Sequence, residues 1–227
     1  SSEAVYQVHR LFVFSKRRRD MKDYITIEGE AQAEFVERKS RFIGYCRHVE
    51  TETEALAFVE QLKKQNWDAT HNVFAYSLRE GQLKRCSDDG EPQGTAGVPV
   101  LDVLQKSGVV DVCMVVTRYF GGILLGAGGL VRAYSHGASI ALEAAKKLHM
   151  TPCTRLSLDM DYGWYGKVSY ILPQYNILVE ESSFTDRVSM TLLIKSSRKE
   201  KFQADLVELT NGCVVPKEII EEYADMQ

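Results

Sequence analysis

Five glycines crowd the segment between Arg118 and Arg132, and this crowding restricts the local fold more than any other feature of the chain. The run before it, VVDVCMVVT (109–117), is short, apolar and rich in β-branched residues, which indicates a buried strand. The run after it (130–148) carries Ala, Leu and Glu at helical spacing. We therefore expect a glycine-rich connection that leads from a strand into a helix.

This connection is open to two interpretations. Bare backbone N–H groups at a helix start attract an anion, and two nearby arginines would add charge-assisted contacts. Neither the P-loop spacing nor the G-x-G-x-x-G fingerprint is present, because Val131 follows Gly126 and Gly128 where the third glycine would stand. Nucleotide binding by those two mechanisms is therefore not expected. The structural alternative is that glycine supplies positive φ and close packing between strand and helix.

The cysteine pattern and the hydropathy point to a cytoplasmic protein without a cofactor. Five cysteines are scattered along the chain, with no C-x-x-C pair and an odd total, which favours reduced thiols. The five histidines do not fall into zinc-ligand spacing with them, so no metal is expected. No apolar run reaches the roughly 18 residues that a membrane span needs, so we expect no membrane partner.

The net charge of the chain argues against strong binding to polyanions such as RNA over the whole surface. The net charge is −3, and residues 1–20 hold five basic and two acidic side chains, which leaves −6 for the rest. Binding to RNA would therefore need a local patch of Lys and Arg. We interpret residues 1–20 as an extension ahead of a native start at Met21. A basic arm that contacts nucleic acid is the alternative.

Residues 21–150 form the first predicted domain, in which strand-like and helix-like runs alternate. Its elements in chain order are two strands joined by a turn (24–49), an amphipathic helix (52–66), a hairpin (72–92), a short helix (97–108), the strand 109–117 and the helix 130–148. Thr51 or Thr53 is expected to cap the first helix, and Gly108 to end the second.

Residues 151–227 form the second predicted domain, since HMTPCT (149–154) interrupts the pattern with a proline. Its elements are a strand (155–162), a helix (164–174), two strands (176–185 and 186–195), a helix closed by Asn211 and Gly212, and a final strand (214–220). This β-α-β-β-α-β order is typical of a ferredoxin-like domain. The whole chain is thus predicted to be α+β.

An acidic loop, SDDGEPQGTAGVP (87–99), is the second candidate site. Asp88, Asp89 and Glu91 have the oxygen ligands that Mg²⁺ or Ca²⁺ prefers, but they lack the ligand spacing of a calcium loop. Acidic residues with Gly and Pro also form turns readily, which is the structural alternative. Thr95 is interpreted as the cap of the helix that follows.

No catalytic set can be assembled from the sequence. His71 stands at the start of a predicted strand, where a hydrogen-bonded structural histidine is more common than a general base. No Ser-His-Asp or Cys-His set can be assembled from the linear spacing of these residues. A non-enzymatic role is therefore the first hypothesis.

Three segments, in this order along the chain, closely resemble the IMPACT family: KSRF (39–42), DDGEPQGTAGVP (88–99) and VVDVCMVVTRYFGGILLGAGGLVRAY (109–134). The second domain makes the chain similar to the bacterial YigZ-type branch. The resemblance covers residues 39–144 by motif and the C-terminal domain by architecture. It implies a first domain (a mixed sheet with helices) like domain 2 of ribosomal protein S5, and a ferredoxin-like second domain similar to domain V of elongation factor G.

The resemblance also points toward translation, because both fold comparisons lead to the translation apparatus. In eukaryotic relatives the family restrains a stress-activated kinase that shuts down translation initiation. That role depends partly on an additional N-terminal interaction domain, for which residues 1–20 are too short, so kinase inhibition is not expected here.

The resemblance implies a functional surface without assigning a catalytic role to any residue. The residues expected to bind an anion or nucleic acid are Lys39, Arg41, Arg118, Gly121, Gly122, Gly126, Gly128, Gly129 and Arg132, and the acidic site would hold Asp88, Asp89 and Glu91. The leading hypothesis is a translation-associated regulator that binds RNA, the ribosome or a translation factor. The alternatives are a metal-dependent enzyme, such as a hydrolase, acting on a phosphorylated or peptide-like small molecule, and a pure protein-interaction module. The sequence does not specify an oligomeric state.

Overall fold

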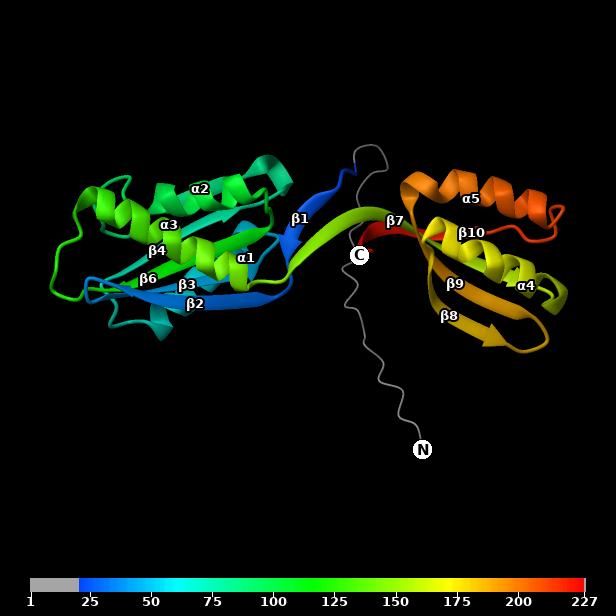
Figure 1. Ribbon diagram of the computed structural model, residues 1–227, viewed down its shortest axis with the longest axis horizontal. Helices are drawn as coiled ribbons and strands as arrows, with labels where there is room; N and C mark the ends of the chain where they lie inside the picture. Colours follow the sequence, from blue (N-terminus) through cyan, green and yellow to red (C-terminus); the bar gives the residue numbers. More distant parts are fainter. Residues whose placement is uncertain (1–20, 227) are drawn as a thin grey trace, which may run out of the picture. The chain divides into compact units, whose positions relative to one another are not determined.

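The computed structural model describes residues 21–226, which divide into two compact units (Figure 1). The first unit spans residues 24–148, and the second contains residues 149–226 together with residues 21–23. The predicted N-terminal extension (1–20), with both of its interpretations, lies outside the described residues. None of the helices between residues 21 and 226 is long and apolar enough to cross a membrane.

The first unit is built on a five-stranded sheet with the order β2-β3-β6-β4-β5, in which all neighbours are antiparallel. The strands are β2 (Glu30–Glu37), β3 (Ser40–His48), β4 (His71–Ser77), β5 (Lys84–Ser87) and β6 (Val112–Tyr119). The middle strand β6 is buried along nearly its whole length, which explains its continuous apolar sequence.

Helices cover both faces of this sheet (Figure 1). They are α1 (Glu52–Gln65) on one face, and α2 (Gly97–Ser107) with α3 (Gly126–Ala144) on the other. Successive residues of β6 alternate between the two cores: Met114 packs with the α2 and α3 side chains, and Val115 packs with those of α1. Because both faces are occupied, only the edges and ends of the sheet are free to bind a partner.

The structure corrects two predicted elements of the first unit. Residues 24–48 form three strands instead of two, because Gly29 at φ +62° separates β1 (Tyr24–Ile27) from β2. The helix α3 begins at Gly126, four residues earlier than predicted, and ends at Ala144. Three of the five glycines therefore lie in the first turn of the helix and not in the connection before it.

The second unit has the element order β-α-β-β-α-β. It contains β7 (Lys147–Met160), α4 (Tyr162–Ile171), the 3-10 helix η2 (Leu172–Tyr175), β8 (Leu178–Phe184), β9 (Val188–Lys195), α5 (Ser196–Leu209) and β10 (Lys217–Asp225). Its strands follow the order β10-β7-β9-β8 with antiparallel neighbours. Side chains of α4 and α5, such as Val168 and Phe202, form the core with alternate residues of β7 and β9.

The segment 149–154, where the sequence suggests a break between domains, lies inside strand β7. Pro152 is tolerated there because only β10 pairs with it, through Tyr223, and the pairing of β7 with β9 begins one residue later at Cys153. A proline fits at such a position because the missing N–H faces no second strand.

Candidate nucleic-acid interface

Three segments of the first unit meet where β6 ends. The carbonyl of Arg118 accepts from the Thr70 backbone N–H (2.9 Å), and the Thr70 hydroxyl accepts from the Phe120 N–H (3.0 Å). The Ser40 hydroxyl accepts from the Gly121 N–H (3.2 Å). These bonds bring together the β2–β3 turn (38–41), the turn after α1 (66–70) and the chain from β6 into α3 (118–132). We call this region the loop end.

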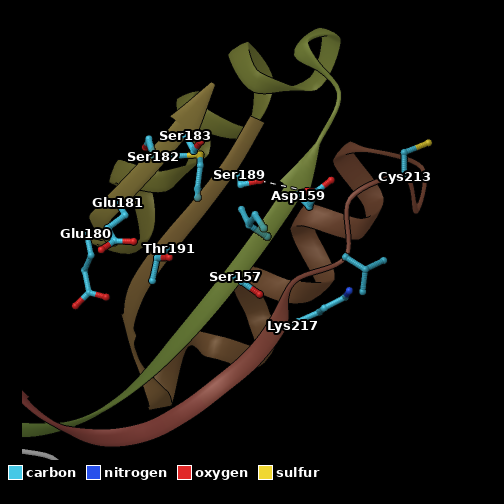
Figure 2. Close-up of a pocket in the computed structure, with 13 residues that line it drawn as sticks. Ser157, Asp159, Glu180, Glu181, Ser182, Ser183, Ser189, Thr191, Cys213 and Lys217 are labelled. Carbon is cyan, nitrogen blue, oxygen red and sulfur yellow. Dashed lines mark hydrogen bonds between the residues drawn. The ribbon is translucent and has the colours of Figure 1, made fainter. Parts of the chain in front are cut away.

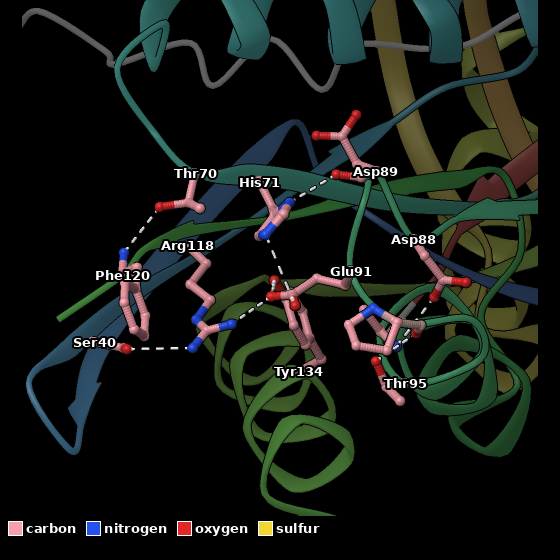
Figure 3. A network of polar contacts seen from close by, with 12 residues as sticks. Ser40, Thr70, His71, Asp88, Asp89, Glu91, Thr95, Arg118, Phe120 and Tyr134 are labelled. Carbon is pink, nitrogen blue, oxygen red and sulfur yellow. Dashed lines mark hydrogen bonds and ion pairs between the residues drawn. The ribbon is translucent and has the colours of Figure 1, made fainter. Parts of the chain in front are cut away.

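A buried network of polar contacts surrounds Arg118 at the loop end (Figure 3). Arg118 is 5% exposed, and its Nη1 donates to Oε1 of Glu91 at 2.6 Å. The Tyr134 hydroxyl donates to the same carboxylate oxygen at 2.8 Å, and Arg118 Nη2 donates to the Ser40 hydroxyl at 3.5 Å. Burial and the adjacent Glu91 charge raise the pKa of Tyr134, so its hydroxyl stays protonated and donates.

His71 borders this network. Its Nδ1 lies 2.8 Å from the carbonyl oxygen of Asp89, so Nδ1 carries the proton that it donates there. Its Nε2 lies 3.8 Å from Oε2 of Glu91. His71 is thus fixed by hydrogen bonding at the start of β4.

The sequence predicts that Arg118 and Arg132 both assist anion binding at the helix start, and the structure places only one of them there. Arg118 is already paired with a carboxylate below the surface. Arg132 is exposed, and within residues 21–226 no carboxylate pairs with it. Its Nη1 lies 3.8 Å from the point where a Cβ on Gly128 would stand, beside the first turn of α3. The N-cap residue of that helix, Leu125, provides no side-chain cap, and no side chain among residues 21–226 is seen to accept from the N–H groups of that turn. The exposed N-terminus of α3 therefore has one guanidinium beside it, not two.

The glycines of the loop end have separate roles. A Cβ on Gly121 would lie 2.0 Å from the backbone carbon of Lys39, so no other residue fits against the β2–β3 turn. Gly122 (φ +82°) and Gly126 (φ +71°) adopt the left-handed conformation that glycine tolerates. Gly128 and Gly129 have negative φ and follow in the first turn of α3. The need for glycine is thus structural at the first three positions.

The two basic residues of the β2–β3 turn differ in their surroundings. Lys39 is exposed at φ +67°, and within residues 21–226 no carboxylate pairs with it. Arg41 is exposed as well, but its Nη2 lies 2.5 Å from Oε2 of Glu34. The Arg41 guanidinium also stands 5.9 Å from the ring centroid of Tyr119. Lys39 is therefore the more available of the two cations.

Asp88 of the acidic loop caps α2. Its Oδ1 accepts from the backbone N–H groups of Ala96 (3.1 Å) and Gly97 (2.8 Å), and its Oδ2 accepts from that of Gly94 (2.9 Å). Burial opposes ionisation, but these three donors prevail and lower the pKa of Asp88 below its usual range. The prediction that Thr95 caps α2 is wrong, because its hydroxyl donates to the Pro92 carbonyl instead.

The other two carboxylates of the acidic loop have different partners. Asp89 accepts from the Asn72 N–H (2.6 Å) and pairs with Lys63 (2.9 Å), while Glu91 belongs to the Arg118 network. Between residues 21 and 226, no three His, Cys, Asp or Glu side chains gather as a metal site would require. The three carboxylates expected to share a site therefore stabilise three separate local structures.

Exposed aromatic and apolar side chains at the loop end were not identified from the sequence. Trp67 is 82% exposed, Leu124 is 81% exposed and Phe120 is 45% exposed. The one available signal is that Trp67 stands in a turn between polar residues (QNWDAT, 65–70), where an aromatic side chain has no core to enter.

The second unit offers a groove of a different character (Figure 2). The groove has a volume of about 930 Å³ and runs along β7, β8 and β9. Its polar lining includes Ser157, Thr191 and Asp159, which accepts a hydrogen bond from Ser189 at 3.2 Å. None of its 13 lining residues is aromatic. It therefore presents no ring on which a nucleobase could stack.

None of the five cysteines takes part in the loop end, and all five are free thiols. Burial raises the pKa of Cys46 to about 11 and that of Cys113 to about 12. Such thiols stay protonated and behave as small apolar side chains.

Comparison with known proteins assigns this two-unit α+β chain to a family. The model of the Impact N-terminal domain matches residues 38–142, and the model of a domain of unknown function (DUF1949) matches residues 158–212. The chain is 40% identical over 193 residues to the IMPACT family member YvyE of Bacillus subtilis, covering 85% of this chain and 89% of that protein. The IMPACT family member YigZ of Escherichia coli is 36% identical over 178 residues, covering 77% and 87%.

A solved structure described as the crystal structure of an hypothetical protein is similar to this chain. It shares 33% sequence identity with a TM-score of 0.57 and covers 89% of this chain and 100% of its own. The chain therefore belongs to the IMPACT family, in its YigZ-type branch.

Proposed function

We propose that this protein is a non-enzymatic regulator associated with translation, and that it binds RNA of the translation apparatus at the loop end. The observation that carries the proposal is the exposure, at one end of the first unit, of Lys39, Arg132 and the uncapped N-terminus of α3. Cations and free backbone N–H groups are the donors that bind phosphate. The likeness to IMPACT proteins supports the link to translation.

The local charge of the loop end supports RNA as the ligand, although the chain as a whole is acidic. In the ion pairs Arg41–Glu34 and Lys63–Asp89 the two charges cancel. The charge of the buried Arg118 is likewise neutralised by Glu91. Lys39 and Arg132 remain as two exposed cations without a carboxylate partner among residues 21–226, against one exposed carboxylate of the loop end, Asp68, which accepts from the Tyr119 hydroxyl. Sequence-independent affinity for RNA comes from cations of this kind.

Two fold similarities would also link the protein to translation. We propose that the second unit is ferredoxin-like and similar to domain V of elongation factor G, which its strand order β10-β7-β9-β8 supports. We propose that the first unit is similar to domain 2 of ribosomal protein S5. The cytoplasm is the compartment in which such a protein would work.

Co-sedimentation with ribosomes and with a structured ribosomal RNA fragment, over a range of salt concentrations, tests this function. The affinity of the unaltered chain should fall as salt rises, and Lys39→Ala and Arg132→Ala should each weaken binding roughly fivefold. Lys84→Ala is the matched control, since exposed Lys84 pairs with Ser77 at the opposite end of the same sheet. Salt-independent binding, or a double variant that binds like the unaltered chain, would contradict the proposal. Sedimentation only in the presence of an added translation factor would assign the contact to that factor.

A further inference from the structure

Trp67 is the most exposed of the large apolar side chains at the loop end, at 82%. It stands in the turn between α1 and β4, directly after Asn66, which ends the helix. Its indole ring contributes nothing to either core of the first unit. Tryptophan is enriched at binding interfaces, where burial of its ring by a partner contributes favourably to the binding free energy.

The turn that carries Trp67 is held firmly in place. Asn66 is buried, donates through its side-chain amide to the Leu62 carbonyl (3.1 Å) and accepts from the Tyr119 hydroxyl (3.1 Å). The Ala69 N–H donates to the Asn66 carbonyl (3.0 Å), and the Thr70 N–H donates to Arg118 (2.9 Å). The backbone on both sides of Trp67 is therefore fixed while its ring stays in solvent. A ring presented in this way loses little conformational entropy on binding.

Charged side chains of both signs stand close to this ring in the sequence, and the exposed Asp68 carboxylate follows it directly. Lys64 is exposed in the last turn of α1, three residues before Trp67. The Tyr119 hydroxyl donates to Asn66 and to Asp68 (3.4 Å), and the Arg41 guanidinium that stands over the Tyr119 ring is paired with Glu34. Thr70 connects the same turn to Phe120, which is 45% exposed. Exposed aromatic rings together with unpaired basic side chains are the elements from which single-strand binding surfaces are made. Within residues 21–226, Trp67, Phe120 and Lys64 are of this kind.

We propose that the loop end binds unpaired RNA, and that Trp67 is a platform on which an unpaired base stacks. This inference rests on the proposed function and names the class of RNA. In duplex RNA the bases are already stacked on each other, and side chains cannot read the deep major groove. A ring standing free of the protein surface therefore favours splayed bases over a duplex. Lys64, with Lys39 and Arg132 of the loop end, would contact the phosphates of the same strand.

Fluorescence gives a direct test, because the chain has two tryptophans and the other, Trp164, lies in the second unit. In a Trp164→Phe variant all tryptophan emission comes from Trp67. Titration with a uridine oligonucleotide should quench this emission, and a blunt RNA duplex of equal length should quench it much less. In the reciprocal Trp67→Phe variant, the emission of Trp164 should not change with either RNA.

Affinity measurements with the same single-stranded probe give the second readout. Trp67→Ala should weaken binding by about 5-fold to 150-fold, the range found for loss of one stacked base. Trp67→Phe should retain most of the affinity, because a ring remains. Tyr170→Ala is the matched control, since Tyr170 is an exposed aromatic residue (77%) in the second unit, and this variant should bind like the unaltered chain.

The outcomes separate this inference from the function on which it rests. Salt-sensitive RNA binding without quenching of Trp67, and with full affinity in Trp67→Ala, would overturn the stacking inference and leave the proposed function standing. Equal affinity for the duplex and the single strand would overturn the preference for unpaired RNA. If Trp67→Ala abolishes capture of a protein partner in nuclease-treated samples while RNA binding is unchanged, the ring belongs to a protein interface instead.

Discussion

Two groups of cationic and aromatic residues lie at the same end of the first unit. We call the buried group the lower layer and the exposed group the upper layer. In the lower layer Arg118, Glu91 and Tyr134 satisfy one another below the surface. In the upper layer Lys39, Arg132 and Trp67 are exposed. Of the R-Y-F-G-G motif (118–122), Arg118 belongs to the lower layer, whereas Phe120 is 45% exposed. Two of the exposed residues best placed to contact a ligand, Lys39 and Trp67, lie in the β2–β3 turn and in the turn after α1.

The largest effect should come from breaking the lower layer. Arg118→Ala leaves Glu91 buried without its ion-pair partner, and the free energy of unfolding should fall by about 3 to 5 kcal/mol. Arg132→Ala, in the upper layer, should change it by less than about 0.5 kcal/mol. Urea denaturation followed by circular dichroism measures both. Equal stability of the two variants would remove the distinction between the layers.

The next effect concerns the contact that joins the layers. In Gly121→Ala the new Cβ would collide with the Lys39 backbone, and the free energy of unfolding should fall by about 1 to 3 kcal/mol. Gly163→Ala in α4 is the control, because no atom stands within 4 Å of its Cβ position. There alanine should be neutral or stabilising by up to about 1 kcal/mol. A Gly121→Ala variant as stable as the unaltered chain would show that the turn and the loop move apart freely.

A smaller, pH-dependent effect is expected at Asp88. Asp88→Ala removes the carboxylate that caps α2 and should lower the free energy of unfolding at pH 7 by about 1 to 2 kcal/mol. Because the pKa of Asp88 is lowered in the folded state, its contribution is present above about pH 4 and is lost as the pH falls through the folded value. Denaturation curves at several pH values should therefore converge for the two chains in acid. A gap that stays constant from pH 7 down to about pH 2 would show that the charge is irrelevant to the cap.

The smallest effect belongs to a single cation of the upper layer. Lys39→Ala should leave stability unchanged and reduce the slope of log affinity against log salt for RNA by about 0.7 to 0.9, the loss of one phosphate contact. Fluorescence anisotropy with labelled RNA at several salt concentrations measures this slope. An unchanged slope would place Lys39 outside the contact.

Local signals predicted much of the secondary structure. The Thr51 cap, the left-handed Gly108 after α2 and the continuous apolar strand β6 all follow from residues within one turn or one strand of each other, and all three are confirmed. The start of α3 was missed because glycine is a poor helix former, and its position in the first turn depends on the tertiary fold.

The site was less predictable because its decisive contacts are long-range. Arg118 and Glu91 are 27 residues apart in the sequence, and nothing in either motif indicates that one neutralises the other. Asp88 replaced Thr95 as the cap of α2 because the acidic loop folds back on the helix start. The exposure of Trp67 depends on which face of the turn is covered, and a sequence pattern does not contain that information.

Photo-cross-linking to single-stranded RNA carrying 4-thiouridine, with the linked peptides mapped by mass spectrometry, tests most directly whether the loop end is the RNA-binding surface. We expect the cross-links to fall in residues 38–41, 66–70 and 118–132, and to disappear when unlabelled RNA competes. Cross-links confined to residues 149–226, or to the opposite end of the sheet around Lys84, would contradict the account.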